Sequence, residues 1–399
     1  MPTGCPDLFE IASASEVVLA CGGGGVGKTS VAAAAGLQIA LERAGKVLVL
    51  TVDPAKRLAT ALGLDSLGNA LKRVPDDAFI QAGLDKPKGE LWVAMLDMKQ
   101  SWDDLVSRHA PDKDTRDKIL SNPLYESITS RFIQSHDYIA VERLYEEYTS
   151  HKFDLIVVDT PPSRNAMDFL DAPKRMADFL SSRLLKWLIM PYRSKLISMA
   201  SRPFYQIADK ILGSQFLVDI SEFFVAFQSM YDGFKKRAVE VEVLLKGQGT
   251  SFIIVTTLEE VPSREAETFV EELGKRKMNL RGIVLNKVLP EYFMDVDTLK
   301  LANKIASDPV GIASKLSLSG AGGAGGKDDM DESLYSTTLY EIAGSFLDFH
   351  QASYNEQIQR AKFEDGGYST IVLPRLDDDI SDLGGLAALT GYIPNETAV

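Results

Sequence analysis

Short runs of apolar, β-branched residues alternate along the chain with longer stretches in which apolar positions recur at helical spacing. Several runs are apolar almost throughout, such as Leu155-Ile-Val-Val158 and Phe252-Ile-Ile-Val255, which is typical of parallel strands covered on both faces. Strands separated by helical patterns predict βαβ units and a mostly parallel sheet. We expect strands near Glu16–Cys21, Lys46–Val52, Leu91–Met95, Phe153–Val158, Ser251–Thr256, Arg281–Leu285 and Thr370–Pro374.

Two regions depart from this alternation. Residues 165–247 carry helical pattern with no strand signal, and residues 316–333 form a low-complexity, Gly-rich connection that we expect to be flexible, followed by a long helix over about Glu332–Phe363. The pattern therefore predicts an α/β core whose first part is 1–164, a helical subdomain at 165–247, and a second part of the core at 248–399.

Composition narrows the classes of protein that this chain can represent. An apolar fraction of 45% leaves ample material for a core, and a formal net charge of -13 argues against a nucleic-acid partner bound by broad phosphate neutralisation. The two cysteines are too few for a disulfide framework or a Cys-rich zinc site. Because no segment reads as a secretory signal or a membrane span, we expect a cytoplasmic protein.

The strongest chemical signal is the stretch Cys21-Gly-Gly-Gly-Gly-Val-Gly-Lys-Thr-Ser30, between a strand pattern and an Ala-rich helix pattern. It matches the Walker A motif, in which glycines turn backbone N–H groups toward phosphate oxygens at a helix N-terminus. Lys28 is then expected to reach the β- and γ-phosphates, and the Thr29 hydroxyl to ligate Mg²⁺. The residues expected to contact the nucleotide here are Gly22, Gly23, Gly24, Gly25, Val26, Gly27, Lys28, Thr29 and Ser30.

Two further strand patterns end in an aspartate, Asp53 and Asp159, at the edge where an open parallel sheet presents ligands. Asp159 follows four apolar residues and fits the Walker B acid that supports Mg²⁺. Asp53 fits a role in orienting the attacking water, next to the metal, because phosphoryl transfer depends mainly on positioning. The alternative for both is a helix N-cap, a position where Asp is common.

Together these segments resemble the ArsA-type ATPases, within the deviant Walker A group of P-loop proteins. The resemblance is carried by Gly24-Gly-Val-Gly-Lys-Thr29, Thr51-Val-Asp-Pro-Ala55 and Val158-Asp-Thr-Pro-Pro162, which look like the P-loop, switch I and switch II of that family. It implies a P-loop NTPase fold with a mostly parallel, helix-flanked sheet and an inserted α-helical subdomain. It also implies ATP and Mg²⁺ as cofactors, Asp53 and Lys28 as catalytic residues, and Thr29, Asp53 and Asp159 around the metal.

The same resemblance extends to the C-terminal part of the chain. Gly282-Ile-Val-Leu-Asn286 looks like the family strand whose asparagine contacts adenine, and Ile371-Val-Leu-Pro-Arg-Leu376 looks like the final strand and adenine loop, with Pro374 against the base. Leu289 stands where a guanine reader would have a carboxylate, so ATP is favoured over GTP. The family further implies a homodimer that closes around two ATP molecules.

Several positions depart from the family pattern. The signature lysine of the deviant Walker A loop, which reaches the phosphates of the opposite subunit, is replaced by Gly23, and loss of that cation should weaken the coupling of dimer closure to catalysis. Arg57 or Arg164 could substitute, or either could be an ordinary surface arginine. The interfacial Cys-x-x-Cys and the arsenite-responsive cysteines are absent, so we expect no zinc.

The helical region offers the one clue to a cargo. Six residues with helical spacing form one apolar face: Ile220, Phe223, Phe224, Phe227, Tyr231 and Phe234. Such a face either binds an apolar client helix or packs on neighbouring helices, and the second is the more common use of this spacing.

These observations favour an ATPase that drives a nucleotide-dependent dimer switch and handles an unidentified cargo, either a hydrophobic protein segment, as in a membrane-protein partner, or an anion. A nucleotide-regulated partner-binding switch with weak turnover is a second hypothesis, which Gly23 favours. A MinD/ParA-like positioning ATPase is a third, against which the acidic balance counts.

Overall fold

The computed structural model describes residues 7–52, 59, 61, 62, 64, 68–131, 133–161, 166–182, 214–318, 332–380 and 382–391. Within this part of the chain an eight-stranded sheet has the order β3-β4-β2-β5-β1-β6-β7-β8. Neighbouring strands are parallel except β3 and β4, which pair antiparallel. The strands are β1 (Val17–Cys21), β2 (Lys46–Thr51), β3 (Lys72–Arg73), β4 (Glu90–Met95), β5 (Leu155–Asp159), β6 (Thr250–Thr256), β7 (Leu280–Val288) and β8 (Thr370–Pro374).

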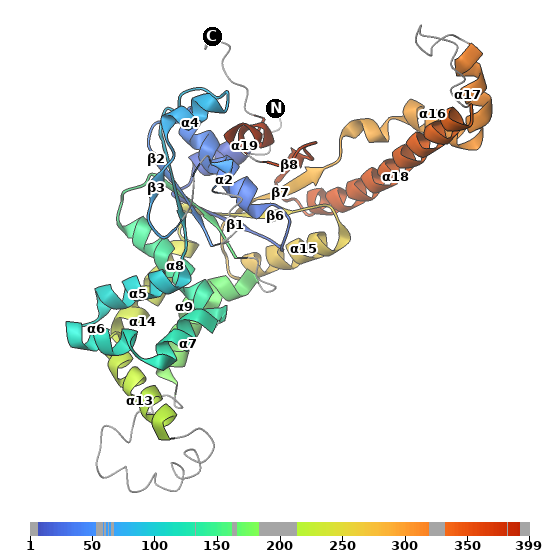
Figure 1. Ribbon diagram of the computed structural model, residues 1–399. Coiled ribbons are helices and arrows are strands. Elements are labelled where there is room, and N and C mark those ends of the chain that lie inside the picture. Colours follow the sequence, from blue (N-terminus) through green and yellow to red (C-terminus); the bar gives the residue numbers. More distant parts are fainter. Residues whose placement is uncertain are drawn as a thin grey trace.

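Helices cover both faces of this sheet, which confirms the predicted α/β class (Figure 1). Those placed before and between the first strands are α1 (Leu8–Ser13), α2 (Lys28–Glu42), α4 (Asp76–Gln81), α5 (Met98–His109), α6 (Lys113–Leu120), α7 (Pro123–Arg131) and α8 (Ile133–Thr149). The later ones are α9 (Ala166–Ser181), α13 (Ser214–Gln228), α14 (Tyr231–Lys246), α15 (Glu260–Lys275), the 3-10 turn η1 (Glu291–Met294), α16 (Val296–Ser307), α17 (Pro309–Leu318), α18 (Glu332–Asp365) and α19 (Leu383–Leu389).

The two faces of the sheet belong to two separate apolar cores. Alternate strand residues such as Val47 and Val49 pack with α2 and α19 on one face, whereas Leu48 and Leu50 pack toward α8, α14 and α15 on the other. This alternation is the period-two geometry of a strand. The Ala-rich α2 lies close to the sheet, since a Cβ on Gly36 would collide with the Val49 side chain.

A third core fills a layer of helices below the sheet (Figure 1). Stacked rings of Phe223, Phe227 and Phe234 lie at its centre, with neighbouring centroids 5.2 Å apart. Tyr138 and Trp102 continue the stack from α8 and α5. The apolar face predicted in the helical region therefore packs on neighbouring helices, which is the more common of the two alternatives.

The helical layer draws on more of the chain than residues 165–247, because α5, α6, α7 and α8 also supply buried residues to its core. Buried charges tie the layer together: Glu142 on α8 pairs with Arg237 on α14 and accepts a 2.7 Å hydrogen bond from Tyr138. Burial raises the pKa of Glu142, while Arg237 opposes that shift.

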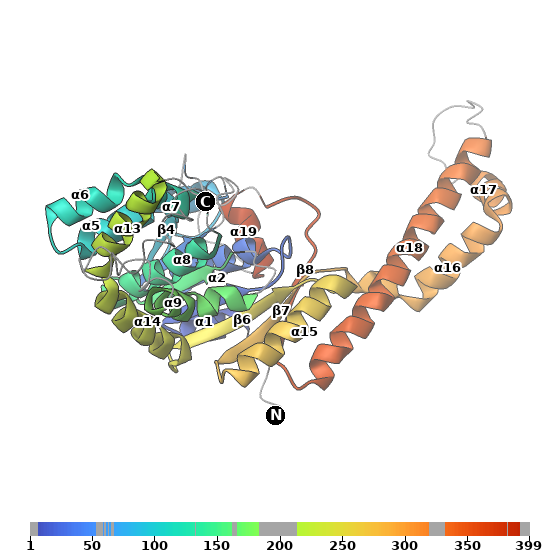
Figure 2. The same ribbon diagram turned by 90° about the horizontal axis from the view of Figure 1, so that it is seen from below.

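An extended arm of helices leaves the sheet between β7 and β8 (Figure 2). It consists of η1, α16, α17 and the 34-residue α18. The sequence predicts α18 nearly to the residue but not the two helices before it. None of the described helices is long and apolar enough to cross a membrane.

The link between α9 and α15 gives a test of how the helical layer is fixed to the sheet. Arg276 donates to both carboxylate oxygens of Asp171, at 2.5 and 3.0 Å, and these bonds lower the pKa of Asp171 below its ordinary 3.8. A lowered carboxyl pKa stabilises the fold above the ordinary pKa and loses that effect as the pH falls through the folded-state value. We expect Asp171→Asn to lower the free energy of unfolding by about 1 kcal/mol at pH 7.

Urea unfolding at pH 7 and at a series of lower pH values measures this difference. The gap between wild type and variant should shrink as the pH drops below about 4. Glu271→Gln, which removes an exposed carboxylate from the same helix α15, is the matched control and should leave stability nearly unchanged. A gap that persists unchanged into acid would contradict the ion-pair explanation.

Candidate functional site

The loop between β1 and α2 wraps tightly at the carboxyl edge of the sheet. Gly22, Gly25 and Gly27 have φ of 151°, 78° and 93°, a region that favours glycine. A Cβ on Gly22 would collide with the Val255 carbonyl oxygen, and one on Gly27 with the Asn286 side-chain amide. Another residue at Gly22 would therefore push the loop away from β6, and one at Gly27 would displace the Asn286 side chain.

The N-terminus of α2 is open to an anion. Gly27 is its N-cap and supplies no side-chain cap, and no acidic residue lies in the first turn. The first N–H groups of a helix lack intrahelical partners and attract negative charge. Glycine conformation and an uncapped helix therefore fit a bound phosphate group.

Lys28 begins α2 and is buried, with its Nζ donating to the Gly23 carbonyl at 2.6 Å. The lysine thus lies folded over the loop that it is expected to serve. Val26, by contrast, is buried in the core beneath the loop, so its side chain anchors the loop rather than facing outward. Gly24 and Gly25 are exposed, and Ser30 is half-buried in the first turn of α2.

A buried carboxylate joins three elements beside the loop. Asp159, 1% exposed at the end of β5, accepts from Thr29 Oγ1 at 2.5 Å and from Thr51 Oγ1 at 2.8 Å. Thr51 and Asp159 are direct partners in the β2–β5 ladder. A carboxylate and a threonine hydroxyl are oxygen ligands of the kind Mg²⁺ prefers, so this corner fits that ion.

Asp53 lies two residues beyond the end of β2 and, like Arg57 and Arg164, lies outside the described residues. Its predicted role in orienting water stays a prediction. Thr51 was not identified from the sequence as a site residue, although its place at the carboxyl end of a central parallel strand is a usable signal.

Asn286 braces the P-loop from β7. Its buried side chain donates Nδ2 to the Val26 carbonyl at 2.8 Å, and Lys287 Nζ lies 3.3 Å from the Gly25 carbonyl oxygen. The β7–β8 register shifts between Leu285 and Val288, and Lys287 has a φ of 61°. This irregularity turns both side chains onto the loop. The sequence predicts that Asn286 contacts the base, but it carries no signal that Asn286 also holds the P-loop in place.

Pro374 ends β8 and pairs with Val288, which places it beside the end of the strand that carries Asn286. Arg375 donates its backbone N–H to the Val288 carbonyl at 2.9 Å and continues this pairing. The two residues predicted to meet a base are thus brought to neighbouring strand ends. A separate cavity of about 650 Å³ is lined by Leu258, by residues between 288 and 298 and by residues of α18. No residue of the P-loop lines it.

Two features near the loop set its electrostatics. Cys21 is buried, which raises the pKa of its thiol to about 12, so this cysteine stays protonated and unreactive at neutral pH. Glu265 of α15 places its carboxylate against Gly23, where a Cβ on that residue would point. Gly23 therefore lies beside an acidic side chain of the same chain.

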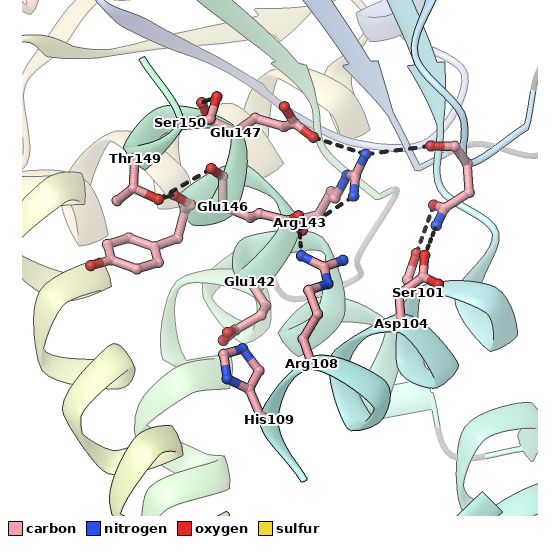
Figure 3. Close-up of polar contacts among 12 residues, drawn as sticks. Ser101, Asp104, Arg108, His109, Glu142, Arg143, Glu146, Glu147, Thr149 and Ser150 are labelled. Carbon is pink, nitrogen blue, oxygen red and sulfur yellow. Dashed lines mark hydrogen bonds and ion pairs between the residues drawn. The ribbon is translucent and has the colours of Figure 1, made fainter. Parts of the chain in front are cut away.

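Asn69, shortly before β3, anchors its segment to the helical layer. Figure 3 shows its partners Ser101, Asp104 and Arg143. The Asn69 side-chain amide donates to Asp104 at 3.0 Å and its side-chain oxygen accepts from Ser101 at 2.8 Å, both on α5. Its backbone carbonyl accepts from Arg143 of α8 at 3.4 Å, and Arg143 also pairs with Glu147 at 2.8 Å. Polar groups thus join the end of this segment to two helices of the third core.

Comparison with known proteins agrees with this geometry. Residues 15–310 match a family model described as anion-transporting ATPase, a range that runs from before β1 into α17. Two putative arsenical pump-driving ATPases of Aquifex aeolicus (strain VF5) are similar, one 23% identical over 302 residues (72% of this chain, 67% of that protein) and one 24% identical over 282 residues (69% and 80%). ATPase get3 of Aspergillus niger (strain ATCC MYA-4892 / CBS 513.88 / FGSC A1513) is 23% identical over 269 residues (67% and 71%).

Replacing Asn286 tests its role as a brace. Asn286→Ala leaves the Val26 carbonyl without its amide donor and opens space beside Gly27, so we expect affinity for ATP to fall about tenfold, or ~1.4 kcal/mol. Affinity for inorganic tripolyphosphate, which has no base, should fall as well. Both are measured by equilibrium titration, the second by competition with a fluorescent ATP analogue.

The matched control is Asn279→Ala. It removes a similar hydrogen bond, from the Asn279 side-chain amide to the Thr250 carbonyl at 3.2 Å, at the opposite end of the β6–β7 pair. It should leave both affinities unchanged. A loss of ATP affinity with no loss of tripolyphosphate affinity would show that Asn286 serves the base alone.

Proposed function

The chain belongs to the anion-transporting ATPase family and is a P-loop ATPase, and from this premise we propose that ATP hydrolysis drives a switch within a homodimer that handles a cargo. The observation that carries the proposal is the Thr29–Asp159–Thr51 group beside an uncapped helix N-terminus. Hydroxyl and carboxylate oxygens beside a phosphate cradle suit a nucleotide with its metal ion.

Under this proposal each residue of the site has a separate role. Lys28 and the loop N–H groups hold the phosphates, and Thr29 with Asp159 hold Mg²⁺. When bound there, Mg²⁺ would neutralise part of the negative charge on the transferred phosphoryl group. Asp53 orients the attacking water, Asn286 keeps the loop in shape, and Asn286 and Pro374 border the adenine.

Between the two kinds of cargo, the cysteines favour an apolar protein segment over an arsenite-like anion. Arsenite binds thiolates, but the chain has only Cys5 and Cys21, and Cys21 is buried with a thiol pKa of about 12. A soft anion thus lacks a reactive thiolate in the described part of the chain. The ArsA-type group that the sequence resembles includes ATPases that target tail-anchored membrane proteins, and these supply the precedent for an apolar client.

Gly23 supports a second function, a partner-binding switch that turns over ATP only weakly. In the resembling group a lysine from each subunit neutralises charge on the opposite phosphates, whereas here the corner holds the Glu265 carboxylate. Binding of ATP would then set the conformation while hydrolysis stays slow.

Steady-state ATPase assays separate the two functions. The leading proposal expects turnover in the wild type, loss of ATP binding in Lys28→Ala, and retained binding with at least about a 100-fold lower rate in Asp53→Asn. Asp178→Asn, an exposed aspartate on α9, is the control and should keep the wild-type rate. If the wild type bound ATP tightly but hydrolysed it at a negligible rate, the leading proposal would be wrong and the partner-binding switch would be the remaining function.

The corner at Gly23 gives a second test. In Gly23→Lys the new ammonium lies beside Glu265 and pairs with it in its own chain, so we expect the ATPase rate to stay within about twofold of wild type. Gly23→Lys combined with Glu265→Gln frees the lysine and should raise the rate well above either parent. Glu265→Gln alone controls for loss of the carboxylate. A single Gly23→Lys variant as fast as the double variant would contradict this explanation.

A further inference from the structure

The arm, defined as residues 291–318 and 332–365, extends away from the sheet (Figure 2). It carries many of the large apolar side chains that are exposed in the described part of the chain. Twelve of the 20 large apolar side chains that are exposed in the described part of the chain belong to it, although it is a small part of that chain. Monomeric proteins rarely expose such a concentration without a use for it.

Part of this surface is ordered as a straight seam along α18. Tyr335, Ile342 and Phe349 are exposed and recur every seven residues, with Ile342 60% exposed. The smaller Thr338, Ser345 and Ala352 recur between them at the same spacing. A seven-residue repeat of this kind matches the side-chain packing of a second helix, with large residues entering the spaces above small ones.

The helices of the arm leave most of this seam uncovered, and among the described residues only Phe293 of η1 reaches it, stacking on Phe349 with ring centroids 4.8 Å apart. They pack on another side of α18, where Ala343 and Ser353 are buried. From Tyr335 to Ala352 the seam runs about 27 Å at 1.5 Å per residue. A partner helix of about 18 residues would therefore cover it.

Charge decides between the possible occupants. Glu341 and Asp348 flank the seam seven residues apart, and residues 333–355 contain no lysine or arginine. The arm as a whole has ten acidic and five basic residues. A second copy laid along the seam would set carboxylate against carboxylate, and an anionic membrane would be repelled, since surface-lying helices bind through basic residues.

We propose that the α18 seam is a docking surface for a partner protein that presents an amphipathic helix with an apolar stripe flanked by lysine or arginine. The apolar stripe packs over Ile342 and its seam neighbours, and the basic side chains face Glu341 and Asp348. This surface lies apart from the P-loop corner, so the proposal does not depend on ATP hydrolysis.

Two synthetic 21-residue helices test the proposal on the full-length protein. Both carry Leu at the first and fourth positions of each heptad, and the flanking positions are Lys in one peptide and Glu in the other. We expect saturable binding of the Lys peptide by fluorescence anisotropy, weakened by added salt, and at least about tenfold weaker binding of the Glu peptide.

Variants of the seam locate the binding. Ile342→Glu should weaken the Lys peptide at least about tenfold, whereas Val243→Glu, on an equally exposed valine of α14, should not. Glu341→Lys with Asp348→Lys should reverse the preference toward the Glu peptide. The ATPase rate of Ile342→Glu should match wild type, which keeps this test separate from the proposed function.

Four results would overturn the proposal. Equal binding of the two peptides, or binding that Ile342→Glu does not change, would remove the seam from the interaction. Self-association that Ile342→Glu abolishes, measured by sedimentation velocity, would assign the seam to a second copy of the chain. Binding to phosphatidylcholine vesicles that the same variant abolishes, with no peptide binding, would assign it to a membrane.

Discussion

The carboxylate of Asp159 fixes the geometry on which the candidate site depends. It lies at the end of β5 and accepts hydrogen bonds from the first turn of α2 and from the end of β2. A buried charge is costly unless hydrogen bonds satisfy it, so the two threonine hydroxyls and the carboxylate hold one another in place. The start of α2, and with it the P-loop, is thereby set against the sheet before any ligand arrives.

Much of the fold can be predicted from the sequence because its signals are local. The runs 155–158 and 252–255 are apolar on both faces, and each lies in a central parallel strand. The Gly-rich motif likewise predicts the turn from β1 into α2, since the need for positive φ is written into the glycines themselves. The membership of the anion-transporting ATPase family agrees with both.

Other features depend on contacts between distant residues and leave no local signal. The two-residue strand β3 is too short for a pattern to appear. The hydrogen bond from the Asn286 side-chain amide to the Val26 carbonyl joins positions 260 residues apart. In the sequence Glu265 has the pattern of an ordinary exposed helix residue. Only the packing of α15 beside the loop brings its carboxylate to Gly23. The contribution of α5–α8 to the helical layer is hidden in the same way, because amphipathic helices do not reveal which neighbour their apolar side contacts.

The last helix, α19, has a consequence for how the protein is made. Its buried leucines 383, 386 and 389 complete the core around α2, near the opposite end of the chain. The strand before it, β8, pairs with β7 only after the whole arm has been synthesised. During translation the P-loop helix therefore keeps part of its apolar side uncovered until residues 383–389 have been synthesised, and the nascent chain must be protected from aggregation for that time.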